Sequence, residues 1–115
     1  MRYALVVAVL LARSASAQAL TTERAKVALP HDSVTLVEVS YGPGGSSKPH
    51  QHPCPVIAYV VSGALRSRVG EAPESTYTAG QTFYEPKGAE HRVSANASKD
   101  RPVTFLAIFV CDRPR

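Results

Sequence analysis

The chain has 115 residues, a length that suggests one domain. Thirteen lysines and arginines against nine acidic residues give a formal net charge of +4. The basic residues are scattered and are not interleaved with aromatic residues, so the sequence argues against nucleic-acid binding.

The first residues have the pattern of a secretory signal peptide. Arg2 precedes an apolar run of nine residues, 4–12, and Ala15-Ser16-Ala17 follows as a small-x-small cleavage site. We therefore expect a signal peptide over residues 1–17, cleaved after Ala17 or alternatively after Ala19, and a periplasmic or secreted mature protein. The alternatives are a wrongly assigned start or a buried N-terminal strand. No later stretch is long enough to span a membrane.

Residues 18–33 show no clear period and are interpreted as an N-terminal extension. Residues 21–26 are expected to form a short helical turn or to stay loose. His31, between Pro30 and Asp32, is expected to be a surface turn residue. The domain proper is then predicted over residues 34–112.

From residue 34 onward the chain is predicted to be a series of short strands. Alternating or β-branched segments are separated by turns rich in glycine and proline, a pattern typical of an all-β sandwich or barrel. The expected strands are 34–41, 56–61, 65–69, 76–78, 83–84, 91–95 and 103–110. No helix of any length is expected in this region.

Three of the four histidines point to a metal site. His50 and His52 are one residue apart between prolines, and in an extended segment residues i and i+2 face the same side. Their rings can then meet on one metal ion. His91 follows a Pro-x-Gly turn that could bring a third imidazole to the first two.

These histidines lie in two motifs that resemble those of the cupin superfamily. Gly44, His50, His52 and Gly63 match the first cupin motif, G-x5-H-x-H-x3/4-E-x6-G. The second motif, G-x5-P-x-G-x2-H-x3-N, is matched by Gly80, Pro86, Gly88 and His91. Two positions depart: the glutamate of the first motif falls on Val56, and the asparagine of the second falls on Ala95, one place before Asn96. The resemblance covers about residues 34–110 and implies a double-stranded β-helix, or jelly-roll barrel.

The resemblance also implies a function. His50, His52 and His91 would hold a divalent transition metal (Fe, Zn, Ni, Mn or Cu), and a small-molecule ligand or substrate would bind beside it. Without the glutamate, the metal would keep its full +2 charge and favour anionic ligands with two oxygens. Cupins with three-histidine sites include dioxygenases, so an oxygen-using enzyme is the first hypothesis. A non-redox isomerase, lyase or cyclase and a non-catalytic binding module are the alternatives.

Three residues are predicted to line the substrate pocket: Val56, Tyr84 and Phe105. Val56 occupies the place of the missing carboxylate and is expected to face inward with the histidines. Glu85, Glu90 and Tyr84 lie near the second motif, where they could act as acid or base, although surface or packing roles are favoured for them.

The sequence leaves the state of the two cysteines open. Cys54 and Cys111 could form a disulfide, stay as buried thiols, or, for Cys54, provide a metal ligand.

Strands 56–61 and 103–110 are apolar on both faces. One face would fill the barrel and the other needs a cover, so a homodimer is predicted.

Overall fold

The computed structural model describes residues 19–114, and within this range the chain forms ten strands and no helix. No helix that could cross a membrane is therefore found in the described range. The strands are β1 (Leu20–Ala28), β2 (Asp32–Tyr41), β3 (Ser46–Ser47), β4 (His50–Gln51), β5 (Val56–Ser62), β6 (Ala64–Val69), β7 (Ser75–Thr78), β8 (Thr82–Glu85), β9 (Glu90–Asn96) and β10 (Val103–Asp112). The predicted signal peptide, residues 1–17, lies outside the described range.

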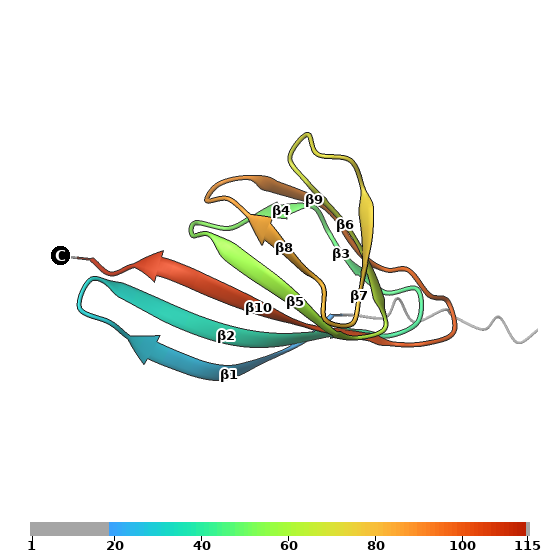
Figure 1. Cartoon of the computed structure of the whole chain (residues 1–115), viewed down its shortest axis with the longest axis horizontal. Helices are drawn as coiled ribbons and strands as arrows, with labels where there is room; N and C mark the ends of the chain where they lie inside the picture. Colours follow the sequence, from blue (N-terminus) through green and yellow to red (C-terminus); the bar gives the residue numbers. More distant parts are fainter. Residues whose placement is uncertain (1–18, 115) are drawn as a thin grey trace, which may run out of the picture.

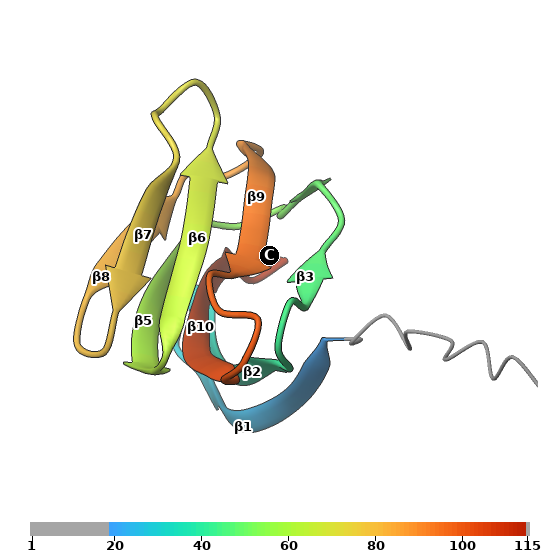
Figure 2. The ribbon, with the colours of Figure 1, turned by 90° about the vertical axis from the view of Figure 1, so that its right-hand side faces the viewer.

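The strands form two antiparallel sheets that face each other. The first has the order β1-β2-β10-β5-β8, and the second has the order β3-β9-β6-β7 with β4 also paired to β9. Figure 1 shows β1, β2 and β10 on one side of the molecule and β9, β6 and β7 on the other. In Figure 2 the second sheet lies in front of the first. This arrangement confirms the predicted all-β jelly-roll barrel.

The space between the sheets is filled by alternate side chains. In β5, Val56, Ala58 and Val60 are almost completely buried, whereas Ile57 and Tyr59 between them are 44% and 41% exposed. The same alternation continues in β10, because successive side chains of a strand point to opposite faces. The strands that the sequence shows as apolar on both faces therefore have one buried face and one apolar outer face, which is exposed in β5 and partly buried over most of β10.

The N-terminal extension differs from the expectation. Residues 20–28 form neither a helical turn nor a loose segment; they are β1, which pairs antiparallel with β2 over its whole length. β1 is an edge strand and nearly all its side chains are exposed, so burial imposes no alternation on its sequence. His31 is exposed at the turn between the two strands, as predicted.

A motif glycine and a buried asparagine fix the connections between strands. Gly63 has a φ of +80°, and a Cβ at this position would lie 2.5 Å from the carbonyl oxygen of Pro102, so only glycine fits the turn from β5 to β6. Asn96 is buried, and its side-chain amide donates to the carbonyls of Gly42 and Arg101 at 3.0 and 2.7 Å. Asn96 thus anchors two loops, although it stands one place later than the motif asparagine.

Candidate metal centre

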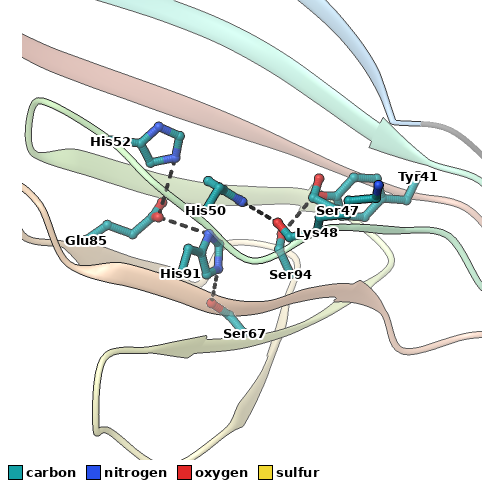
Figure 3. Close-up of polar contacts among 9 residues, drawn as sticks. All are labelled: Tyr41, Ser47, Lys48, His50, His52, Ser67, Glu85, His91 and Ser94. Atoms are coloured by element: carbon teal, nitrogen blue, oxygen red, sulfur yellow. Dashed lines mark hydrogen bonds and ion pairs between the residues drawn. The ribbon is translucent and has the colours of Figure 1, made fainter.

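Four side chains converge inside the barrel. His50 lies on β4, His52 follows it, Glu85 ends β8 and His91 lies near the start of β9. One nitrogen or carboxylate oxygen from each lies within 4.8 Å of the others. We call these four residues the His/Glu cluster; Figure 3 shows His52 and His91 pointing toward the Glu85 carboxylate.

Backbone pairing brings the two cupin-like motifs together. His50 of β4 is directly opposite His91 of β9 in the antiparallel register. The N–H of Gly88, in the turn before β9, donates to the carbonyl of His52 at 2.9 Å. The structure therefore brings together the three histidines that the sequence predicts as ligands, and it explains why the Pro-x-Gly turn precedes the third.

A disulfide holds the segment that follows His52. Cys54 and Cys111 are bonded, with their Cα atoms 5.0 Å apart, so the first of the three alternatives for these cysteines holds. The N–H of Val110 also donates to the carbonyl of Pro55 at 3.1 Å. These two contacts attach the end of the His50-x-His52 segment to β10, next to the cavity wall.

Glu85 is the member of the cluster that the sequence reasoning did not predict as a metal ligand. The sequence favours a surface or packing role for it, but its side chain is only 5% exposed and belongs to the cluster. In the register of β5 and β8, Glu85 is directly opposite Val56. Residues opposite each other in adjacent strands share a face and lie close together. The carboxylate that the first motif lacks is thus supplied from the neighbouring strand.

The environment of Glu85 fits a bound cation. Its Oε1 lies 2.9 Å from Nδ1 of His91 and 3.7 Å from Nε2 of His52. Within residues 19–114 this buried oxygen nevertheless accepts no hydrogen bond, because no N–H is aimed at it. A buried carboxylate oxygen without a partner is costly. A metal ion between Oε1 and the ring nitrogens would remove that cost.

The histidines present lone pairs to the cluster. Nδ1 of His50 lies 2.7 Å from the carbonyl of Lys48, which can only accept, so Nδ1 carries the proton and Nε2 is free to ligate. His91 faces Glu85 through Nδ1, and its Nε2 lies 2.8 Å from the hydroxyl of Ser67. Partners of this kind orient metal-binding imidazoles.

His52 is favoured in its neutral, ligating form. Burial lowers the pKa of His52 below its usual value; the Glu85 carboxylate opposes this shift, and His50 and His91 add to it. The approach of His52 to Glu85 is therefore not an ion pair at neutral pH. The rings of His52 and Phe109 also pack nearly perpendicular to each other, with centroids 5.0 Å apart.

A cavity of about 230 Å³ adjoins the cluster. One wall is apolar and comes from β2 and β10; the rest carries the cluster and four hydroxyl groups. Its lining residues are Thr21, Val37, Val39, Tyr41, Ser47, His50, His52, Glu85, His91, Ser94, Phe105, Ala107 and Phe109. A groove of about 490 Å³ near His31 and Arg113 lies apart from this cluster.

Of the three predicted pocket residues, the structure places one on the cavity. Phe105 lines it. Val56 faces inward, as expected, but it is fully buried in the hydrophobic core and does not reach the cavity surface. Tyr84 is 57% exposed, because β8 alternates and directs Phe83 and Glu85 inward. Glu90, with a side chain 43% exposed, lies outside the cluster.

Comparisons with known proteins agree with this fold. The model of the Cupin domain family matches residues 37–109. No curated protein matches the chain. A solved structure of DMSP lyases is similar, with 26% identity over 66% of this chain and 37% of that one, and a TM-score of 0.59. An oxalate decarboxylase variant from Bacillus subtilis has 28% identity over 66% of this chain and 21% of that one, with a TM-score of 0.59.

A third solved structure matches over nearly its full length. It is a cupin domain from Bordetella pertussis Tohama I, with 24% identity over 82% of this chain and 94% of that one, and a TM-score of 0.63. By contrast, the chain spans well under half the length of the DMSP lyase and the oxalate decarboxylase.

Proposed function

Because the chain belongs to the Cupin domain family, we propose that it is a metal-dependent enzyme acting on a small anionic or enolisable molecule. One observation carries the proposal. The buried Oε1 of Glu85 accepts no hydrogen bond in the described range, and it lies among three histidine rings whose donor atoms are all within 4.8 Å. A metal-binding role accounts for both facts, whereas a purely structural role leaves this oxygen without a hydrogen bond.

The donor set fits a divalent transition metal. Nε2 of His50, Nε2 of His52, Nδ1 of His91 and Oε1 of Glu85 are the atoms that would hold it, and imidazole nitrogen suits Zn, Cu, Fe and Ni. A metal bound there supplies a Lewis acid for an oxygen-bearing substrate. The ionised carboxylate lowers the net charge of such a centre to +1, from the +2 that follows if the histidines are the sole ligands.

The surrounding residues define what can bind. No lysine or arginine is among the residues lining the cavity in the described part of the chain. An anionic substrate would therefore find its positive partner only at the His/Glu cluster. The apolar wall, which includes Val37, Phe105 and Phe109, keeps water away from the rest of the substrate. The lining thus favours a small molecule with one charged end and an apolar body.

The fourth donor does not decide the reaction class, because histidine and carboxylate ligands together also serve non-haem Fe(II) oxygenases. We favour the non-redox alternative, an isomerase, lyase or cyclase, on another ground. The names of two similar structures, a DMSP lyase and an oxalate decarboxylase, are in keeping with bond-breaking chemistry on small acids.

The test uses the metal-loaded mature protein. Small carboxylates and diketones are incubated with it; products are followed by NMR and oxygen by an electrode. We expect metal-dependent conversion without oxygen uptake, reduced in Glu85→Gln and retained in the surface control Glu90→Gln. Oxygen uptake would instead identify dioxygenase chemistry, and ligand-induced stabilisation without any conversion would identify a binding module.

We also propose that the protein is exported and that it forms a homodimer. A disulfide between Cys54 and Cys111 is in keeping with an oxidising compartment, as is the signal-peptide pattern of residues 1–17. The outer face of the first sheet exposes several apolar side chains, more than the isolated ones usual on a monomer. They are Ile57, Tyr59, Val61, Tyr84 and Val110. We propose that a second copy of the chain covers this face.

A further inference from the structure

Three hydroxyl groups meet on the cavity wall beside the His/Glu cluster. Tyr41 ends β2, Ser47 ends β3 and Ser94 lies on β9, opposite Ser47 in the register. The phenol oxygen of Tyr41 lies 2.6 Å from Oγ of Ser47 and 2.8 Å from Oγ of Ser94. We call these residues the hydroxyl trio; Figure 3 shows it to one side of the cluster.

A count of protons leaves the trio with one unused donor. Three hydroxyls carry three protons, and each of the two contacts uses one. In the part of the chain that the structure describes, none of the three oxygens has another hydrogen-bond partner. Tyr41 and Ser94 are only 2% and 3% exposed. Ser47 is half-buried, and all three residues line the cavity, so the third proton is available to an acceptor inside it.

The chemistry of the cavity shows what kind of acceptor fits. The trio is uncharged, and no lysine or arginine lies near it on the described lining, so a second anionic group would be buried there without a counter-charge. A neutral hydroxyl or carbonyl oxygen carries no such penalty. The cavity volume of about 230 Å³ also sets a size limit. Because a protein cavity of about 150 Å³ binds benzene, roughly ten non-hydrogen atoms fit here.

We propose that the hydroxyl trio is a second binding subsite, which takes a neutral hydroxyl or carbonyl oxygen of the same small acid whose charged end lies at the His/Glu cluster. The substrate class is then a hydroxy or oxo acid of about ten non-hydrogen atoms with an apolar middle. This inference deepens the proposed function and rests on it. Tyr41 becomes a residue that determines specificity.

Binding of matched acids tests the subsite directly. Zinc-loaded mature protein is titrated by calorimetry with benzoate and with 3- and 4-hydroxybenzoate, which differ from it by one hydroxyl. We expect at least one hydroxybenzoate to bind about tenfold more tightly than benzoate, the effect of one good hydrogen bond. The advantage should be lost in Tyr41→Phe, which keeps the ring that packs on Phe105 at a centroid distance of 5.5 Å.

Control variants distinguish a failure of the subsite from a failure of the proposed function. Tyr77→Phe removes a phenol that lies off the cavity lining and should leave the preference unchanged. Ser94→Ala provides a second variant of the trio, and thermal melting and zinc content verify that each variant is folded and loaded. If wild type binds benzoate but gains nothing from either hydroxyl, the subsite is wrong and the proposed function stands. If no acid binds the zinc-loaded wild type, both are wrong.

Discussion

Replacing Glu85 by glutamine should affect the metal-free and metal-bound proteins in opposite directions. Glutamine keeps the size of the side chain and removes the charge. In the metal-free protein, the carboxylate is 5% exposed and its Oε1 lacks a hydrogen bond in the described range. Such a group costs about 1–3 kcal/mol. Metal-free Glu85→Gln should therefore be at least as stable as the wild type.

With metal present, the wild type should be more stable than Glu85→Gln. Loss of a direct ligand should weaken binding by about 100-fold, the upper end of what loss of an outer partner costs. At a metal concentration of about 1,000 times the wild-type Kd, binding stabilises the wild type by about 4.1 kcal/mol; a 100-fold weaker site gives about 1.4 kcal/mol. The difference of about 2.7 kcal/mol corresponds to roughly 11–22 °C in Tm for a domain of this size.

The assay is thermal melting with a chelator and with excess zinc. Glu90→Gln is the matched control, since its side chain is 43% exposed, contacts Arg92 and lies outside the cluster. Zinc should raise the Tm of Glu90→Gln by as much as it raises that of the wild type. Equal zinc-induced shifts in Glu85→Gln and wild type would refute the reasoning, because the buried carboxylate would then not contact the metal.

Three further predictions follow from the same geometry. Because Val56 is directly opposite Glu85, the double variant Val56→Glu/Glu85→Val should recover part of the zinc-induced shift that Glu85→Val alone loses; no recovery would contradict the shared face. The pKa of His52 is lowered on folding, so its protonation favours unfolding. Metal-free stability should thus fall as the pH drops below about 6.5, and less so in His52→Asn, as urea unfolding at pH 7.5 and 5.5 can show. Ile57→Lys/Tyr59→Lys should yield monomers in light scattering, whereas a monomeric wild type would contradict the dimer.

The strands with a buried face could be predicted from sequence because burial imposes alternation on them. The expected strands at 56–61 and 103–110 agree with β5 and β10 to within two residues. β1 was not predictable in this way, since an exposed edge strand is free of that constraint. β3 and β4 are two residues each, too short to show any period.

The site residues that stand at motif positions could be predicted from the sequence. The residue that joins the site only through strand pairing could not. His50, His52 and His91 stand at motif positions, and the structure brings them together. Glu85 lies opposite the vacant motif position on another strand, and a single sequence does not reveal the register between two strands. Alternation offered one signal, because a strand that buries Phe83 also directs Glu85 inward.

Metal content tests the central claim most directly. The purified protein is analysed by mass spectrometry of the elements alongside His50→Ala/His52→Ala and His91→Ala. The account predicts about one divalent transition-metal ion per wild-type chain and almost none in the variants, because their donors belong to the same cluster. Full metal content in the double variant, or a wild type that binds no metal even when zinc is supplied, would contradict it.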